Sequence, residues 1–245
     1  MKVIGSVKED LGIEKRISIT PEIVKKYIQL GFSINLEKGY GKHLGISDKY
    51  YQNNDANIDN EKKEIFEKSN IILKVNIPSE DEINLIKNDS ILVGQFDLNT
   101  NKDIIDKLLK KNVKIFSLNL LPRITRAQSM DVLSSQANLA GYKSVVESFS
   151  KFEKAIPMMM TAAGTIPAAK VLVIGAGVAG LQAIATAKRM GAVVFATDVR
   201  AASKEQVESL GGKFLTVEDA ENLETEGGYA KETSDDFKKK QEILL

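Results

Sequence analysis

The sequence contains no cysteine and only one histidine, His43. Without cysteine the chain cannot form disulfide bonds, use a thiolate nucleophile or build a zinc site with sulfur ligands. This composition suits a reducing compartment such as the cytosol. His43 stands in an early loop, GYGKHLGIS, where a lone histidine is most often structural or solvent-exposed.

Long apolar runs and an excess of charge are missing as well. No segment approaches the roughly 18 uncharged apolar residues of a membrane-spanning helix. The N-terminal MKVIGSVKED lacks the apolar core of a signal peptide. The formal net charge is +1, with acidic and basic residues interspersed. The charge therefore gives no basis for binding nucleic acid or an anionic membrane.

The composition that remains is that of an ordinary globular protein. A chain of 245 residues suggests one or two domains. Apolar residues make up 43% of the chain and charged residues 27%, which is enough apolar material for a core.

Short apolar runs alternate with helical patterns in the first half of the chain. This alternation predicts an α/β domain with a mostly parallel sheet. Thr20 precedes Pro21 and is expected to cap a helix, while Ser79 and Glu82 have the spacing of a capping box. The expected strands cover 2–7, 33–37, 70–77, 90–96 and 113–119, and the expected helices cover 21–31, 79–88 and 101–112.

A second series of strands and helices follows a long helical stretch, residues 132–155. We therefore expect two Rossmann-like parallel-sheet domains of the α/β class joined by a long helix, with the second domain incomplete. The expected domains are 1–130 and 166–245, and 131–165 forms the connecting helix and linker. In the second series the expected strands are 170–174, 192–197 and 213–217, and the expected helices are 178–190 and 203–211.

The segment VLVIGAGVAGLQ contains the pattern GxGxxG between an expected strand and an expected helix. In a dinucleotide-binding turn, Gly175 would allow the tight turn, Gly177 would let the backbone approach a pyrophosphate, and Gly180 would let the helix pack on the sheet. The helix N-terminus would offer N–H groups to the phosphates. The alternative is a strand–helix turn that is only rich in glycine.

Asp198 ends the next expected strand, close to the roughly 20-residue spacing at which a carboxylate accepts ribose hydroxyls. Such a carboxylate repels a 2′-phosphate by about 4 kcal/mol at about 4 Å and an effective dielectric near 20, which favours NAD over NADP. Arg200 could offset part of that repulsion. Asp198 could also cap the helix that follows Val199, and both interpretations can hold.

The stretch RITRAQSMDVLSSQANLAGY, residues 123–142, places polar side chains at an expected entry into the long helix. Ser129 or Asp131 could simply cap that helix, and the arginines could be solvated. The residues alone leave this open.

These segments together resemble a known family. RITRAQSMD, SSQANLAGY, AIPMMMTAAGTIPAAKVLVIGAGVAGLQAIATAKRMGAVVFATDVRAASKEQVESLGGKF and GGYAKE are similar to the NAD(H)-binding alpha subunit of proton-translocating nicotinamide nucleotide transhydrogenase. The resemblance covers essentially the whole chain and is close from Leu121 to Gln241. MKVIGSVKEDLGIEKRISITPE resembles the start that this family shares with alanine dehydrogenase.

The resemblance implies a set of cofactor-binding residues. Gln128 and Asp131 would position the nicotinamide without acting as acid or base, and Arg123 would support their loop. The glycine turn would hold the pyrophosphate, and Asp198 would sit at the adenosine ribose. The implied contacts are Arg123, Ile124, Thr125, Gln128, Asp131, Ser134, Gly175, Gly177, Val178, Gly180, Asp198, Val199, Arg200, Gly228, Tyr229 and Gln241, and no metal is implied.

The function implied by the resemblance is that of an NAD(P)+ transhydrogenase (proton-translocating, Re/Si-specific) within a multi-chain complex. Hydride would pass from NADH on this chain to NADP+ on a separate NADP(H)-binding domain, and a transmembrane subunit would couple the transfer to proton movement. The implied assembly is a homodimer in the cytoplasm, held at the inner face of the plasma membrane by its partner subunits. No direct membrane insertion and no nucleic acid are implied.

Alanine dehydrogenase is the nearest alternative. That family uses a lysine and a histidine on consecutive strands, and Lys74 can occupy the lysine position. The histidine position falls at or near Asp97, where no histidine stands. Lys74 is therefore expected to be a strand-end charge. Arg16 matches a substrate arginine of the dehydrogenases but also occurs in transhydrogenases, so no chemistry is assigned to it.

The family's alpha subunit runs well beyond the length of this chain. We therefore expect about three strands in the second sheet, with apolar surface exposed at its edge strand. A further alternative follows, in which the chain is an inactive fragment or one piece of a split gene that needs a complementing chain.

Overall fold

The computed structural model describes residues 2–97, 99–122, 124–200 and 202–216, together with 234, 239 and 240. It divides into two compact units, Met1–Met130 and Asp131–Leu245. Each unit contains a parallel sheet with helices packed on it, which confirms the expected α/β class.

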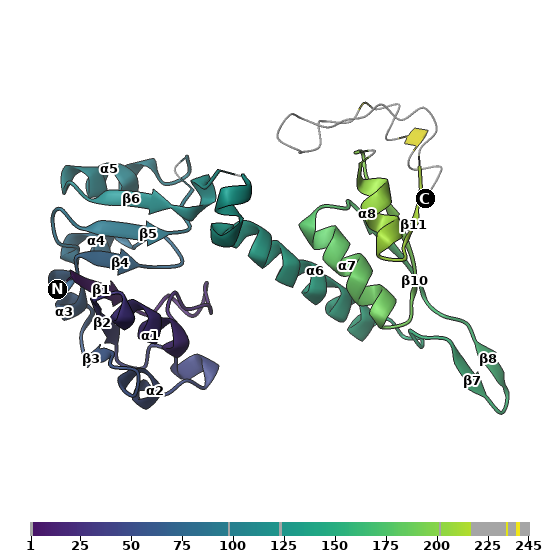
Figure 1. Ribbon diagram of the computed structural model, residues 1–245, viewed down its shortest axis with the longest axis horizontal. Coiled ribbons are helices and arrows are strands. Elements are labelled where there is room, and N and C mark those ends of the chain that lie inside the picture. The colour runs from purple at the N-terminus through teal and green to yellow at the C-terminus, as the bar shows by residue number, and fades with distance from the viewer. Residues whose placement is uncertain are drawn as a thin grey trace. The chain divides into compact units, whose positions relative to one another are not determined.

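The sheet of the first unit has six parallel strands in the order β3-β2-β1-β4-β5-β6 (Figure 1). This is the order of a doubly wound sheet, in which β1 and β4 flank the point where the chain reverses direction. The strands are β1 (Lys2–Ser6), β2 (Phe32–Glu37), β3 (Asn57–Asp59), β4 (Ile71–Leu73), β5 (Ile91–Gly94) and β6 (Lys114–Ser117).

Five α-helices connect these strands. The expected helices are found, but α2, α3 and strand β3 were not expected. Each of the three is so short that no periodicity can be read from its sequence. The helices are α1 (Pro21–Gln29), α2 (Asp48–Gln52), α3 (Lys62–Lys68), α4 (Glu80–Leu85) and α5 (Lys102–Lys110), with 3-10 turns η1 (Lys42–Leu44), η2 (Leu118–Leu120) and η3 (Thr125–Met130).

The two predicted helix starts turn out differently. The capping box of α4 is confirmed, because the Ser79 hydroxyl accepts a hydrogen bond from Glu82 N and the Glu82 carboxylate accepts one from Ser79 N. Thr20 is the N-cap residue of α1 and Pro21 its first residue, but the Thr20 side chain makes no capping hydrogen bond. The prediction of a Thr20 cap is therefore right in position and wrong in its interaction.

Apolar side chains cover both faces of this sheet. Ile4 belongs to a cluster that contains residues of α1 and α2. Its neighbour Gly5 faces α3, where a Cβ would meet Ile65 and Ser69. Because successive residues of a strand point to opposite faces, the two clusters lie on opposite sides of the sheet.

The second unit has a parallel sheet of three described strands in the order β11-β10-β9. Leu172 and Ile174 on the end strand β9 are 41% and 67% exposed, as expected for the edge. The elements are α6 (Val132–Lys151), β9 (Lys170–Ile174), α7 (Val178–Arg189), β10 (Val193–Thr197), α8 (Ser203–Ser209) and β11 (Lys213–Phe214).

Two features of the second unit were not predicted. Residues 155–169 contain an antiparallel hairpin of β7 (Met159–Thr161) and β8 (Gly164–Ile166), which extends away from the three-stranded sheet in Figure 1. The long helix α6 packs along α7 (Figure 1), and a Cβ on Gly141 would lie 2.0 Å from the Ala179 carbonyl oxygen. The glycine thus allows the two helix backbones to touch.

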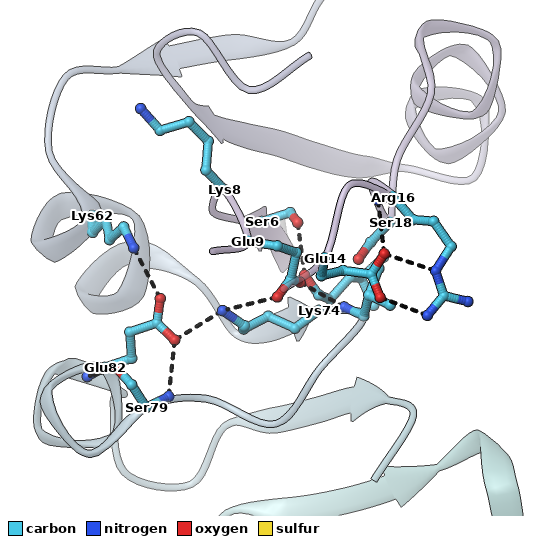
Figure 2. A network of polar contacts seen from close by, with 12 residues as sticks. Ser6, Lys8, Glu9, Glu14, Arg16, Ser18, Lys62, Lys74, Ser79 and Glu82 are labelled. Carbon is cyan, nitrogen blue, oxygen red and sulfur yellow. Dashed lines mark hydrogen bonds and ion pairs between the residues drawn. The ribbon is translucent and has the colours of Figure 1, made fainter. Parts of the chain in front are cut away.

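A cluster of charged side chains closes the carboxyl end of the first sheet, where β1 and β4 end (Figure 2). Lys74, only 5% exposed, follows β4 directly. Its ammonium lies 2.8 Å from a Glu82 carboxylate oxygen and 3.5 Å from an oxygen of Glu9. Lys62 also contacts Glu82, at 3.1 Å. Lys74 is therefore a buried, ion-paired residue, and its prediction as a simple strand-end charge is wrong.

The two carboxyl groups of this cluster respond oppositely to burial. For Glu82, burial raises the pKa, but the Lys74 charge and the hydrogen bonds from Lys74 and Lys62 outweigh it and leave the pKa below its ordinary value. For Glu9, burial outweighs the attraction of Lys74 and the hydrogen bond from Val75 N, so the pKa is raised. Ionised Glu82 is thus the principal counter-charge of Lys74.

Glu82→Gln is expected to lower the free energy of unfolding by about 3 kcal/mol, because it leaves the buried Lys74 without its shorter ion pair. Glutamine retains an oxygen for the capping hydrogen bond from Ser79 N, so the loss reports the charge. Urea unfolding at neutral pH measures it.

Glu80→Gln is the matched control. Glu80 lies two residues earlier in α4 and pairs with Lys107, but its side chain is 70% exposed. An exposed pair contributes about 0–1 kcal/mol, so this variant should unfold almost as the parent does. Equal losses in the two variants would contradict a special role for the buried pair.

Candidate functional site

The glycine-rich turn joins β9 to α7 in the second unit. Gly175 has φ +94°, a backbone conformation that favours glycine, and its N–H donates to the Thr197 carbonyl at 2.8 Å. A Cβ on Gly180 would lie 1.8 Å from the Gly175 carbonyl oxygen, so the helix reaches the strand only because Gly180 has no side chain. These observations confirm the predicted backbone roles of Gly175 and Gly180.

Gly177 differs from both of these glycines. It has φ −74°, which any residue adopts. A Cβ at this position would meet no atom within 4 Å. Neither backbone strain nor internal packing of the described residues requires glycine here. The space beside Gly177 is therefore open for a ligand to approach the backbone.

The N-terminus of α7 opens at this space. Gly177 is the N-cap residue, and no side chain of the described residues caps the helix. The first N–H groups of a helix have no partner within the helix, and the aligned peptide dipoles place partial positive charge there. This end of α7 suits a phosphate group.

Asp198 lies beside the turn, immediately after β10. One oxygen of its carboxylate accepts from Ala176 N at 2.6 Å and from the Arg200 guanidinium at 3.0 Å. The other oxygen accepts from Arg200 N at 2.8 Å and Arg200 Nε at 2.9 Å. Asp198 therefore ties the glycine turn to the loop after β10.

These contacts also settle the alternative role of Asp198. The helix α8 begins at Ser203, its N-cap residue is Ala202, and no side chain caps it. Asp198 does not cap the helix after Val199; it forms a turn with Arg200.

The Asp198 carboxylate is held ionised. Burial raises its pKa, but the hydrogen bonds from Arg200 and from Ala176 N together outweigh burial and place the pKa below its ordinary value of 3.8. The side chain is only 6% exposed. A carboxylate accepts about four hydrogen bonds, and all four positions are filled. A ribose hydroxyl at this carboxylate would compete with the Arg200 guanidinium.

The remaining predicted contacts of this region lie partly within the structure. Val178 opens α7 and is 38% exposed, and Val199 is partly buried between Asp198 and Arg200. Gly228, Tyr229 and Gln241 lie outside the described residues, as does Arg123.

The predicted nicotinamide contacts fall in both units. In the first unit, Ile124 precedes η3, and Thr125 and Gln128 lie within it with exposed side chains. In the second unit, Asp131 caps α6, and its carboxylate accepts hydrogen bonds from Ser134 N at 2.9 Å and Ser134 Oγ at 2.7 Å. The structure thus brings Asp131 and Ser134 together.

The residues of the alanine dehydrogenase alternative lie in the first unit. The Arg16 guanidinium forms two hydrogen bonds with the Glu14 carboxylate, at 2.9 and 2.6 Å. Figure 2 shows this pair near the buried cluster around Lys74. Asp97 follows β5, where its carboxylate accepts from Asn99 N at 2.9 Å.

Sequence reasoning missed two contacts that hold the site. The hydrogen bond from Ala176 N to Asp198 joins residues that are 22 positions apart. The packing of Gly141 against Ala179 sets the position of α6 beside the glycine turn. A glycine inside a long helical pattern was the available signal, because such a glycine costs stability unless packing requires it.

Two further features of the described residues bear on function. No group of three or more acidic or histidine side chains among them is placed to hold a metal ion. None of the helices they form has the length and apolar character needed to cross a bilayer.

Comparison with known proteins agrees with this geometry. The N-terminal domain model of the alanine dehydrogenase/PNT family matches residues 5–140, and the C-terminal domain model matches residues 144–241. The first portion of NAD(P) transhydrogenase subunit alpha from Rhodospirillum rubrum is 50% identical over 245 residues, covering 97% of this chain and 64% of that protein. The chain thus spans a little less than two thirds of that relative's length.

Solved structures give the same result. The crystal structure of transhydrogenase from Sinorhizobium meliloti superposes with a TM-score of 0.84 at 47% identity, covering 88% of this chain and 64% of that one. An L-alanine dehydrogenase structure gives a TM-score of 0.73 at 22% identity, over 86% of this chain and 60% of that one, which supports the fold alone. The predicted resemblance is confirmed, and the chain belongs to the alanine dehydrogenase/PNT family.

Proposed function

We propose that this chain is the NAD(H)-binding component of a proton-translocating transhydrogenase. The observation that carries the proposal is the open space over Gly177, at the start of α7 and beside the ionised Asp198. Structural needs explain the other two glycines of the motif, whereas Gly177 is explained by a ligand. The similarity to transhydrogenase alpha subunits supports the choice of ligand.

The residues of the turn fit a dinucleotide. The backbone at Gly177 and Val178, with the free N–H groups of α7, would hold the pyrophosphate. Asp198 and Val199 would lie at the adenosine ribose. Gly228, Tyr229 and Gln241 complete the proposed contacts.

The pairing of Asp198 with Arg200 bears on the choice between NAD and NADP. To accept ribose hydroxyls, Asp198 must give up some of its hydrogen bonds with the guanidinium. A 2′-phosphate would meet the carboxylate's repulsion as well as the attraction of the guanidinium. The carboxylate is the more buried of the two, 6% against 20% exposed, and cannot move away. We therefore propose NAD(H) here and NADP(H) on a partner domain.

The nicotinamide end requires positioning rather than acid–base chemistry. A bound nicotinamide supplies the hydride chemistry itself, since its ring donates or accepts hydride directly. Gln128 and Asp131 would orient the ring and carboxamide for close approach, Arg123 would support their loop, and Ile124, Thr125 and Ser134 complete this region of the site. The hydrogen bonds between Asp131 and Ser134 would hold that carboxylate in place.

The complex belongs to the same proposal. Hydride would pass to NADP+ on a separate domain, a transmembrane subunit would couple the transfer to proton movement, and the chain would form a homodimer at the inner face of the plasma membrane. Relatives from Rhodospirillum rubrum and Haemophilus influenzae are named as transhydrogenase alpha subunits, which supports a multi-subunit assembly. The alternative is an inactive chain, or one that needs a complementing chain.

Replacement of Gly177 separates a cofactor turn from a merely structural one. Gly177→Ala should leave the free energy of unfolding within about 0.5 kcal/mol of the parent, because the methyl group enters open space at an ordinary φ. It should weaken NADH binding by at least about tenfold, or 1.4 kcal/mol, because the methyl group takes the place of the pyrophosphate. Urea unfolding and NADH fluorescence titration measure the two effects.

Gly180→Ala is the control, since its methyl group would clash with the Gly175 carbonyl oxygen. That variant should lose about 3 kcal/mol or more of stability. If Gly177→Ala bound NADH as tightly as the parent, the turn would have only a structural role.

Asp198→Asn tests the choice of nucleotide. A hydrogen bond from a ribose hydroxyl to a carboxylate contributes about 1.5–3 kcal/mol, so NADH affinity should fall by about 10- to 100-fold. NADPH should lose less, because the repulsion of its 2′-phosphate is also removed. The ratio of the two affinities is the measurement of choice, since partial unfolding of the variant cancels in the ratio.

Glu205→Gln removes the same charge from an exposed position in the first turn of α8 and serves as the control. It should leave both affinities and their ratio unchanged. An unchanged ratio in Asp198→Asn as well would show that Asp198 does not discriminate between the nucleotides.

Activity distinguishes the two enzyme functions. With NADH, thio-NADP+ and a purified NADP(H)-binding chain, the protein should form thio-NADPH, which absorbs at a different wavelength from NADH. Gln128→Ala should lower that rate and change NADH affinity little. Oxidation of NADH by pyruvate and ammonium, without the partner chain, would instead assign the protein to the alanine dehydrogenases. A folded chain that binds no NADH would favour the inactive or split-gene alternative.

A further inference from the structure

A hollow of about 660 Å³ lies in the first unit and takes no part in the proposed cofactor site. It opens where β1 and β2 end, at the carboxyl edge of the parallel sheet, which is where such sheets bind ligands. Its volume is in the range of small-molecule sites, about 300–1,000 Å³. The lining residues are Lys8, Leu11, Lys38, Gly39, Lys42, His43 and Asp48.

Positive charge dominates this hollow. Lys8 is paired with Glu37 at 3.1 Å. In contrast, no described acidic side chain lies within ion-pair distance of Lys38 or Lys42. The one acidic lining residue, Asp48, uses both carboxylate oxygens to accept the Gly39 N–H, at 2.8 and 3.1 Å. Among the described residues, two ammonium groups without an acidic partner therefore face a common space.

His43 adds a further polar group. Its Nε2 lies 2.7 Å from the Lys15 carbonyl oxygen. A carbonyl oxygen only accepts, so Nε2 carries the proton, and Nδ1 remains for another partner.

The loop that carries these residues is held from below. The Tyr40 hydroxyl donates to Ser6 Oγ at 2.8 Å, because the Ser6 hydroxyl itself donates to the Leu73 carbonyl. The same oxygen accepts from Ser18 N at 3.0 Å and Ile19 N at 3.3 Å. Tyr40 is only 1% exposed. The backbone between Lys38 and Lys42 is therefore fixed before any ligand arrives, which lowers the entropy lost on binding.

Stability does not explain this arrangement, because like charges gathered around one hollow repel one another. An anion would remove that repulsion and would form charge-assisted hydrogen bonds with the lysines. We propose that the hollow at the ends of β1 and β2 binds a small, multiply charged anion through Lys38, Lys42 and His43.

The single histidine of the chain provides the probe. Its ring gives one Cε1–H signal in an NMR spectrum of the full chain, and inorganic pyrophosphate is titrated at fixed pH and ionic strength. The signal should shift saturably with pyrophosphate and not with sodium chloride at matched ionic strength. A parallel titration with citrate assigns the chemistry, since saturation by both anions indicates any multivalent anion and saturation by pyrophosphate alone indicates phosphate.

The double variant Lys38→Gln/Lys42→Gln should bind pyrophosphate on the order of tenfold more weakly. Lys25→Gln/Lys26→Gln removes the same charge from two exposed positions of α1 outside the hollow and should bind as the parent does. Thermal melting checks that both variants are folded. A shift that does not saturate, that sodium chloride reproduces, or that both variants weaken equally would overturn the proposal.

Discussion

The approach of α7 to β9 is closer than any side chain permits, and the candidate site depends on it. Gly180 brings the first turn of the helix against the Gly175 carbonyl, and Gly141 brings α6 against the Ala179 carbonyl. These two contacts fix where the N-terminus of α7 points. The open N–H groups and the space over Gly177 are consequences of that placement, since a displaced helix would direct its dipole elsewhere.

The two units use the carboxyl ends of their parallel strands in different ways. In the second unit, the edge keeps open space beside a glycine and places a single ionised carboxylate there, Asp198. In the first unit, Lys74 and two carboxylates fill the corresponding position between β1 and β4 (Figure 2). The same topology thus supports a ligand site in one unit and a buried ion cluster in the other. The difference lies in the residues that follow each strand.

Burial explains the different behaviour of the charged groups. Glu82 and Asp198 both lose water, but each is surrounded by donors that favour its ionised form. Glu9 has fewer such donors, and burial prevails. Lys38 and Lys42 remain exposed around a hollow and keep their hydration. The charges of these two regions are therefore either buried with partners or exposed beside open space, as the cost of desolvation requires.

The sequence by itself determined the α/β class, most strand positions, the capping box of α4 and the backbone roles of Gly175 and Gly180, because each follows from local periodicity or local sterics. It also identified the family. Only the tertiary structure decided that Lys74 is buried among Glu9 and Glu82, that Asp198 binds Ala176 N and Arg200, and that Gly141 meets α7. Most of these contacts join residues distant in sequence. Their partners become known only when packing brings the segments together, and no local pattern records that distance.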